Sequence, residues 1–486
     1  MVQENFDAKE WKIKNYGFED IEDLAHTLRS NSEIRFIRFL TADMLGEREC
    51  SFTVPAGEID KNSLKKGFDA SSLYPERIKE SDKLAFFDPT TARVFPVAYQ
   101  TKTPGFERKW KELIIFGDTI DPRNGAYDYD SRTKLKNALK KANEVTGADT
   151  VNAGPELEFF LLKADDSGNP LIVDSKPVLV DQGGYFKGGK HGDVRKEIQM
   201  LLSEMGYRFE YDHHEAAPSQ HEIDVHYMNA LEMADFMMLY RYVAKRVANA
   251  HGLFASFMPK PVIGVNGSGM HVHQSLFNGG KNLFYNKNDK YELSETAYQY
   301  MAGLMKYIPE VTAFLNQWTN SYKRLVPGYE APVYICWDPQ NRSNLIRKPE
   351  YEPGHEKAAR LELRSADPAA NPYLALTMMI SAGVKGIEEK LQRPEPSDLD
   401  VYHISQEERR RLGIKSLPGS LEEAVNLAEK SELVKSVVGE RFLADFVKIK
   451  KKEIEKSKTY KPIQPSLFQD ENQLSKYELE ELLPIL

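Results

Sequence analysis

Four segments of this chain carry ionisable side chains at alternate positions, with apolar residues between them. They are Glu156-Leu-Glu158, Glu222-Ile-Asp224-Val-His226, His271-Val-His273 and Arg360-Leu-Glu362-Leu-Arg364. Residues i and i+2 of a β-strand point to the same face, so each segment predicts a strand with one charged and one apolar face. Together the four strands predict one polar, concave surface. The alternative for any single strand is an antiparallel sheet with one face in water.

Histidines gather in the same part of the chain. Of the eleven histidines, seven lie from position 213 to 273, namely His213, His214, His221, His226, His251, His271 and His273. Carboxylates that crowd on one face repel each other unless cations neutralise them. Hard divalent ions such as Mg²⁺ or Mn²⁺ prefer oxygen ligands with an occasional imidazole. The pattern therefore predicts bound metal ions.

The composition limits the kind of protein. With 486 residues, 41% of them hydrophobic, the chain can bury a large core and form more than one domain. Its net charge of -8 argues against a nucleic acid partner. The chain has no apolar run of about 20 residues, and the segment Met1–Lys14 lacks the apolar core of a signal peptide. We therefore expect a cytoplasmic protein without a membrane partner. With only Cys50 and Cys336, a disulfide framework is not expected.

The chain divides into a small leading part and a larger trailing part. Alternation in Ile34–Leu40 and Cys50–Val54 predicts strands around a turn at Leu45-Gly46, and Asp121–Gly125 resembles a connection. Helices are predicted over residues 131–145, 193–205, 231–250 and 295–318, and a glycine suited to end a helix follows three of them. Residues 460–472 favour a loop before a final short helix over 476–483. We expect an N-terminal domain over 1–125, with an N-terminal helix, and a second domain over 126–486.

A group of arginines suggests that the site handles anions. They are Arg324, Arg342, Arg347, Arg360 and Arg364, and the loop-forming segment Pro327–Pro332 interrupts them. The planar guanidinium fits the oxygens of carboxylates and phosphates, although any one of these arginines also suits a surface ion pair. Beside a metal site, they point to phosphoryl transfer that involves a carboxylate substrate. Neither a Walker motif nor a Gly-x-Gly-x-x-Gly fingerprint is present, so a nucleotide would bind in another fold.

Seven motifs, in order along the chain, resemble the glutamine synthetase family over about residues 30–445. They are residues 67–72 (GFDASS), 154–161 (GPELEFFL), 213–224 (HHEAAPSQHEID), 266–275 (NGSGMHVHQS), 322–332 (YKRLVPGYEAP), 341–343 (NRS) and 360–364 (RLELR) with 371–373 (NPY). The resemblance implies an α+β fold. It consists of a small β-grasp-like N-terminal domain and a large catalytic domain with a curved antiparallel sheet and flanking helices.

The resemblance also implies an activity. This is the ATP-dependent ligation of ammonia to the γ-carboxylate of L-glutamate, through γ-glutamyl phosphate, to give L-glutamine, ADP and phosphate. Two alternatives stay open: a glutamate-amine (polyamine) ligase of the same fold, and a catalytically silent, nitrogen-sensing relative. The family pattern implies two or three Mg²⁺ or Mn²⁺ ions per subunit, ATP as co-substrate, and a dodecamer with active sites between subunits. Small nitrogen-regulatory proteins or metabolites are further expected partners.

Carried over by position, the resemblance implies roles for individual residues. One metal would be bound by Glu158, Glu215 and Glu222, and a second by Glu156, His271 and Glu362. Glutamate would contact Asn266, Gly267, Arg324, Glu330 and Arg364, and ammonium would contact Tyr185 and Asp69 of a neighbouring subunit. ATP would contact Glu210, Tyr227, His273, Ser275, Arg342, Arg347 and Lys357. The implied catalytic residues are Asp69, Glu330, Arg342 and Arg364, and Arg77 matches a position that couples feedback by glutamine.

Overall fold

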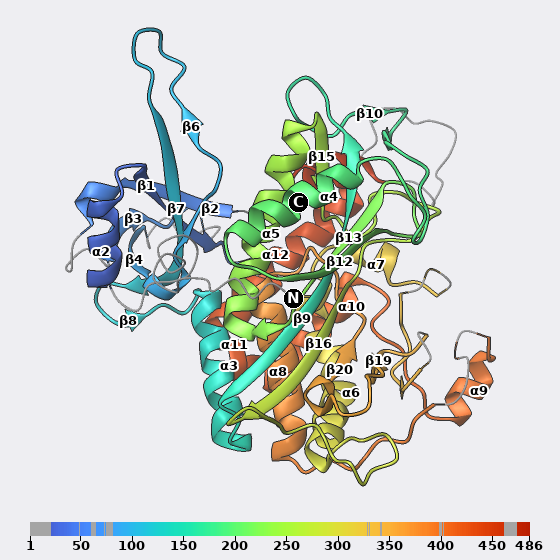
Figure 1. Cartoon of the computed structure of the whole chain (residues 1–486). Coiled ribbons are helices and arrows are strands. Elements are labelled where there is room, and N and C mark those ends of the chain that lie inside the picture. The colour runs from blue at the N-terminus through green and yellow to red at the C-terminus, as the bar shows by residue number, and fades with distance from the viewer. Residues whose placement is uncertain are drawn as a thin grey trace.

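The computed structural model describes residues 21–47, 49–59, 65–71, 73, 81–327, 329, 331–340, 343–397, 401, 403–460 and 474–486. A small sheet lies beside a much larger body of sheet and helices (Figure 1). The α+β class is therefore confirmed. The predictions for Arg77, Glu330, Arg342 and residues 461–472 lie outside the described residues.

Eight strands of the described residues form the small sheet. They are β1 (Ile34–Ala42), β2 (Glu49–Pro55), β3 (Lys65–Asp69), β4 (Asp82–Phe87), β5 (Arg93–Val94), β6 (Tyr99–Gln100), β7 (Lys109–Asp121) and β8 (Gly125–Ala126). The main order is β2-β1-β7-β4-β3, with β1 and β7 parallel and the other pairs antiparallel. Helix α2 (Ile21–Ser30) contributes Leu24 and Leu28 to the core of this sheet. The strands predicted at 34–40 and 50–54 are confirmed as parts of β1 and β2.

The predicted turn at Leu45-Gly46 joins the small sheet to the larger body. Gly46 has a φ of 64°, and a Cβ at this position would lie 2.6 Å from the Cα of Asn371. The Gly46 carbonyl accepts a hydrogen bond of 3.0 Å from the buried Arg241. Only glycine combines this backbone conformation with so close an approach, so the turn is confirmed and forms part of the joint.

Ten strands of the described residues form the large sheet. They are β9 (Thr150–Lys163), β12 (Phe209–His214), β13 (Gln220–Val225), β14 (Met228–Asn229), β15 (Leu253–Ser256), β16 (Met270–Asn278), β17 (Lys281–Asn282), β18 (Trp337–Asp338), β19 (Ile346–Arg347) and β20 (Leu361–Leu363). The main order is β12-β13-β9-β16-β20-β19-β18. The four charged strands are consecutive neighbours, so they form one surface, as predicted. Their pairing is antiparallel, whereas β18 and β19 at the edge are parallel.

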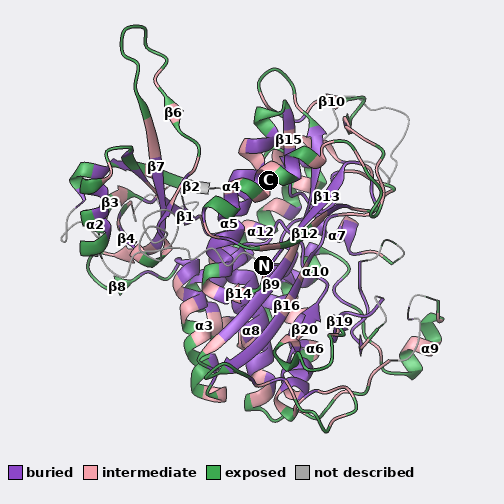
Figure 2. Cartoon of the chain, viewed as in Figure 1, coloured by how far each residue is buried: buried purple, intermediate pink, exposed green. Residues whose placement is uncertain are grey.

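The strand register places the charged residues in line. Glu222 lies opposite Glu158, His271 opposite Glu156, and His273 opposite Glu362. The apolar residues between them face the helices: Phe159 packs against Tyr240, with ring centroids 6.2 Å apart. The sheet is buried along most of its length (Figure 2).

The larger body also contains helices, most of which pack behind the large sheet (Figure 1). They are α3 (Ser131–Thr146), α4 (Gly192–Glu204), α5 (Ala230–Ala250), α6 (Glu295–Leu315), α7 (Ser321–Arg324), α8 (Pro372–Glu388), α9 (Gln406–Arg411), α10 (Leu421–Lys430), α11 (Glu432–Val438) and α12 (Glu440–Thr459), besides the short hairpin β10 (Ile172–Val173) and β11 (Lys176–Pro177). The four long predicted helices are confirmed, but α6 ends three residues early. Asn316 leaves the helix because its side-chain amide donates to the Ser365 carbonyl and to the Asp367 carboxylate, both at 2.9 Å.

The last helix of the chain is partly π-helical. The predicted helix at 476–483 is present but contains a π-helical turn, Glu478–Leu482. This segment packs into the body of the protein, where Leu483 and Leu486 are buried. None of the described helices has the length and hydrophobicity that crossing a bilayer requires.

Candidate active site

The charged faces of β9, β13, β16 and β20 line a cavity of about 310 Å³. Its walls include Glu156, Glu158, Tyr185, Tyr211, His213, Glu215, Gln220, Glu222, Asn266, Gly267, His271, Arg324, Tyr329, Arg347, Glu362 and Arg364. The cavity therefore brings together the carboxylates and arginines that lie far apart in the sequence.

Glu158, Glu215 and Glu222 lie at one side of this cavity. Glu158 accepts hydrogen bonds from the Gln220 side chain at 2.7 Å and from the Gly269 amide at 3.0 Å. Burial, followed by the negative charge of Glu215, raises the pKa of Glu158 to about 8. Burial, followed by Asp224, raises the pKa of Glu222 well above its usual range. These carboxylates are therefore held where an added cation would be needed to ionise them fully.

Glu156, His271 and Glu362 lie at the other side. Glu156 is 2.9 Å from Nδ1 of His271 and 2.8 Å from Nε2 of His273. Burial acts to raise the pKa of Glu156, but the hydrogen bonds from these two histidines hold it well below its usual range. Glu362 accepts 2.5 Å hydrogen bonds from Arg347 and Arg364. This side is thus better neutralised than the first.

Two groups of three donors are close enough to share a metal ion. The atoms of His213, Glu215 and Glu222 lie within 4.8 Å of one another, and so do those of Glu156, His273 and Glu362. Each group shares two residues with a predicted ligand set. The third predicted members, Glu158 and His271, line the same cavity. Carboxylate oxygens with one imidazole suit Mg²⁺ or Mn²⁺.

Arg324 stands beside the loop that carries Asn266 and Gly267. It begins from α7, is buried, and donates to the Ser365 carbonyl at 2.8 Å. A Cβ on Gly267 would lie 3.2 Å from Cγ of Arg324 and 2.4 Å from the Pro259 carbonyl oxygen. The glycine thus allows the backbone to approach the guanidinium stem closely. All three residues line the cavity, together with Arg364.

A second cavity of about 400 Å³ adjoins the first. Both cavities are lined by Glu156, Tyr211 and Arg347. The second also contains the other predicted nucleotide contacts that the structure describes, namely Glu210, Tyr227, His273, Ser275 and Lys357. Arg360 donates to Nδ1 of His273 at 3.2 Å, so Nε2 of this histidine carries the proton that faces Glu156. A ligand spanning both cavities would pass Glu156 and Arg347.

The two predicted ammonium contacts lie in different places. Tyr185 lines the first cavity, and its ring centroid is 5.4 Å from that of His213. Asp69 ends β3 in the small sheet, is exposed, and is absent from the described walls of both cavities. The Ser71 amide donates to Asp69 at 2.9 Å and lowers its pKa, so the carboxylate is ionised at neutral pH.

The structure adds residues that sequence reasoning missed. Gln220 bridges Glu158 and the Gly267 carbonyl, at 2.7 and 3.1 Å. It could have been found, because Gln220, Glu222 and Asp224 continue the same alternation. The buried Lys260 donates to the Val265 carbonyl, and its ammonium lies 4.2 Å from the Tyr329 ring centroid. Burial, followed by Arg324, lowers the pKa of Lys260 to about 8. No pattern around this lysine indicated its position.

A further donor group, Asp181, His214 and His221, lies outside the cavity walls and was also missed. Arg195 approaches Nδ1 of His221 to 2.7 Å. A guanidinium can only donate, so Nδ1 accepts and the neutral ring carries its proton on Nε2. That nitrogen then has no lone pair for a cation. The group is therefore not a metal site, although its residues are buried.

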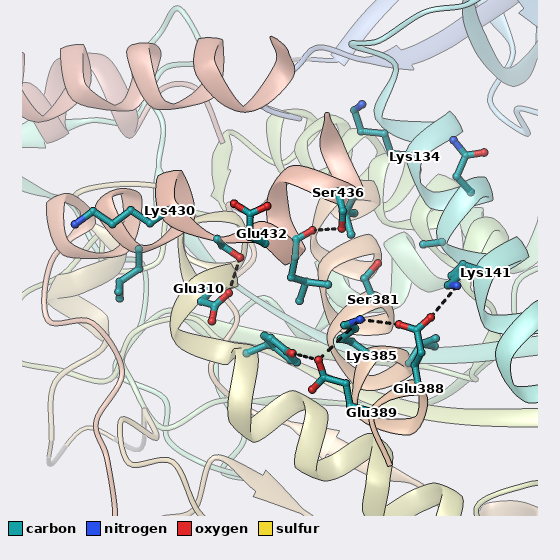
Figure 3. Close-up of a pocket in the computed structure, with 18 residues that line it drawn as sticks. Lys134, Lys141, Glu310, Ser381, Lys385, Glu388, Glu389, Lys430, Glu432 and Ser436 are labelled. Atoms are coloured by element: carbon teal, nitrogen blue, oxygen red, sulfur yellow. Dashed lines mark hydrogen bonds and ion pairs between the residues drawn. The ribbon is translucent and has the colours of Figure 1, made fainter. Parts of the chain in front are cut away.

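A larger cavity of about 1010 Å³ lies between α3, α6, α8, α10 and α11 (Figure 3). Its charged side chains pair with one another: Lys141 lies 3.0 Å and Lys385 2.8 Å from Glu388. Tyr307 donates to Glu389 at 2.7 Å. Because these carboxylates already have partners in the walls, this cavity lacks the features of the carboxylate-rich one.

Known proteins resemble this chain over most of its length. Residues 128–464 match the family described as glutamine synthetase, catalytic domain. A glutamine synthetase of Methanosarcina mazei is 43% identical over 438 residues, which cover 89% of this chain and 93% of that protein. One of Staphylococcus aureus is 40% identical over 439 residues, with the same coverage of 89% and 93%.

Solved structures show the same similarity. The Plasmodium falciparum glutamine synthetase superposes with a TM-score of 0.77 at 25% identity, over 93% of this chain and 98% of that one. A structure titled as a GmaS/ADP complex superposes with a TM-score of 0.75 at 28% identity, over 94% and 98%.

Proposed function

This chain belongs to the glutamine synthetase family, and from that premise we propose that the carboxylate-lined cavity is where it joins ammonia to L-glutamate. The protein is an ATP-dependent ligase that makes glutamine. One observation carries the assignment of the site. The cavity that holds the carboxylates and Arg324 meets the cavity of the nucleotide contacts at Glu156 and Arg347.

The site must supply positive charge for phosphoryl transfer. A carboxylate is a poor target for ammonia, so phosphoryl transfer from ATP to the γ-carboxylate must first create a leaving group. The transferring group needs positive charge, and Arg347 and Arg364, both held by Glu362, lie in the cavity wall to supply it. Mg²⁺ or Mn²⁺, held by the two carboxylate-histidine sets, would add positive charge at the phosphates when bound.

Residues in another part of the cavity wall orient the substrate. Arg324 offers its guanidinium to the α-carboxylate of glutamate, with Asn266 and Gly267 near the amino end. Glu330, in the segment after Tyr329, closes the site so that water does not hydrolyse the acyl phosphate. An ionised Asp69 accepts a proton from ammonium, which must become ammonia before it attacks.

Asp69 and the cavity belong to the same chain but lie apart, which supports an active site shared between subunits. The assembly proposed is the family's dodecamer, with two or three divalent ions per subunit. The proposal includes a cytoplasmic location, regulation by nitrogen-regulatory proteins or metabolites, and a feedback role for Arg77. The domain boundary is proposed after residue 125, within the two-residue strand β8.

The decisive assay is phosphate release from ATP with magnesium and glutamate, with and without ammonium, and with a panel of amines. Wild type is compared with Asp69→Ala, Glu330→Ala and, as a matched control, Glu388→Gln in the cavity of Figure 3. Ammonium-dependent release with glutamine as product, slowed in the first two variants and normal in the control, supports the proposal. Release only with a larger amine would move the assignment to an amine ligase, and no release with any acceptor would favour a sensor.

A further inference from the structure

The loop that carries Tyr185 is wound around the side chain of His214. This histidine ends β12, and its imidazole is completely buried. Its Nε2 lies 2.9 Å from Oδ1 of Asp181, at the start of the loop, and its Nδ1 accepts from the Gly184 amide at 3.0 Å. A proton on Nε2 serves both of these contacts. Nδ1 also lies 2.7 Å from the Glu215 carbonyl, which can only accept, so a ring protonated on both nitrogens would donate to Asp181 and to Glu215 instead.

Two glycines allow the loop to lie this close to the ring. A Cβ on Gly183, whose φ is +24°, would lie 1.8 Å from Cε1 and Nε2 of His214. A Cβ on Gly189 would lie 2.5 Å from Cδ2 of His214 and 2.9 Å from Oδ2 of Asp181. A Cβ on Gly188 would meet nothing within 4 Å. The tight contact is therefore specific to the positions that face His214.

Backbone hydrogen bonds fix the loop at two further points. The Phe186 amide donates to the His214 carbonyl at 3.1 Å. Ser219, next to β13, accepts from the Val180 amide through its hydroxyl at 2.8 Å, and its own amide donates to Asp181 at 2.9 Å. The loop is thus tied to the connection between β12 and β13, which also carries Glu215.

The loop delivers its aromatic residues to the cavity. Tyr185 lines the wall, and its ring meets that of His213 at 5.4 Å, edge to face. Phe186, with a φ of 53°, stacks on the same His213 ring, and the two ring centroids are 4.6 Å apart. His214 points away from the cavity that His213 lines, so two adjacent histidines hold the loop from two sides.

We propose that His214 and Asp181 are positioning residues that set the affinity for ammonium by fixing Tyr185 in the cavity. Neither residue lines the cavity, so neither touches the substrate. The inference rests on the proposed function, in which Tyr185 contacts ammonium. A cation as small as ammonium gains its binding free energy from a few well-placed groups. A small displacement of the Tyr185 side chain therefore weakens ammonium binding strongly.

The test compares Gly189→Ala with Gly188→Ala in the full-length enzyme. The first adds a methyl group against His214 and Asp181, and the second adds the same group to open space. We expect Gly189→Ala to raise the KM for ammonium by about tenfold, while kcat, the KM for glutamate and the magnesium concentration for half-maximal activity change by less than about twofold. Gly188→Ala is expected to match wild type in all four quantities.

A second pair of variants tests the carboxylate. Asp181→Ala removes the acceptor for His214 and is expected to reproduce the rise in ammonium KM. Asp181→Asn keeps one acceptor oxygen and is expected to restore most of the affinity. Thermal unfolding is followed for each variant, because a general loosening of the site would lower kcat and raise the KM for glutamate as well.

The outcomes separate this inference from the function on which it rests. Equal ammonium KM values in Gly189→Ala and Gly188→Ala would overturn it. A changed magnesium requirement with an unchanged ammonium KM would overturn it too, since His214 would then support Glu215 instead of Tyr185. If wild type forms no glutamine from ammonium, the proposed function itself fails, and that result needs no variant.

Discussion

Two clusters of carboxylates in this protein differ in where their positive charge comes from. In the first, Arg132 of α3 lies 2.9 Å from each of Asp88, Asp118 and Asp235. In the second, Glu158 and Glu222 lie opposite each other in the sheet. Among the described residues, no lysine or arginine forms an ion pair with either of these two glutamates.

The difference separates a structural role from a catalytic one. Asp88 and Asp118 belong to the small sheet region, and Arg132 and Asp235 to helices of the large body, so the arginine joins the two parts. Its charge is built into the chain. Glu158 and Glu222 are left with raised pKa values, and the proposed divalent ions would neutralise them when bound. Around Arg132 the chain supplies the cation itself, whereas no lysine or arginine of the described residues forms an ion pair with Glu158 or Glu222.

The largest expected effect is on catalysis. Glu222→Gln removes the charge of a proposed metal ligand and should lower the rate of glutamine formation by about a thousandfold or more. The metal-free protein should be at least as stable as wild type, because a buried repulsion is removed. Rate assays and urea unfolding of the same preparations test this. A variant that loses stability but keeps activity would show that Glu222 behaves like the carboxylates around Arg132.

Replacing the built-in cation should have the opposite signature. Arg132→Met removes the cation that three carboxylates share and should lower the free energy of unfolding by about 3 kcal/mol. Lys136→Met is the control, because Lys136 contacts the same Asp118 but is partly exposed. Its loss should cost less than about 1 kcal/mol. Urea titrations measure both, and equal losses would contradict a special role for Arg132.

The pH dependence of stability should also distinguish the clusters. Glu158 has a pKa of about 8 when folded, against an ordinary value of 4.5, so the folded chain binds more protons between these values. Metal-free protein should therefore lose stability as the pH rises from about 5 to 8, by about 3.5 kcal/mol. Asp88 should show the opposite pH dependence. Burial acts to raise the pKa of Asp88, but Arg132 holds it below its usual value, so the stability that Asp88 contributes is lost only in acid.

Thermal unfolding at several pH values tests this prediction. Millimolar magnesium should flatten the decline, since the ion binds the ionised carboxylates and replaces their protons. Glu158→Gln should reduce the decline without metal, whereas Lys136→Met should keep it. A metal-free protein whose stability does not fall between pH 5 and 8 would contradict the account of the cavity.

These clusters also show what the sequence could reveal. Alternation at Glu156, Glu222 and His271 predicted the charged face, because two-residue periodicity is local. It could not predict which strands are neighbours, since strand order depends on long-range pairing; the register of Glu222 with Glu158 came only from the structure. The family motifs then supplied roles that periodicity alone does not contain.

Arg132 was unpredictable for a related reason. It lies in a predicted helix among several other charged residues, where a solvent-exposed position is the ordinary expectation. Its partners are 14, 44 and 103 residues away along the chain. Likewise, His214 stands next to residues of a recognised motif, but its direction away from the cavity depends on the loop that surrounds it.

The smallest effect is expected in the cavity of Figure 3, where the charges are paired but exposed. Lys141 and Glu388 have side-chain exposures of 54% and 37%, so water and salt screen their attraction. Lys141→Met should therefore lower the free energy of unfolding by less than about 1 kcal/mol and leave glutamine formation unchanged. Urea titrations in low salt and in about 1 M salt measure this. The stabilities of the variant and wild type should be closer in high salt, where screening is nearly complete.

A loss of activity in this variant would instead show that the cavity between α3 and α8 communicates with the carboxylates. Pairing within the chain would then no longer mark a region as purely structural.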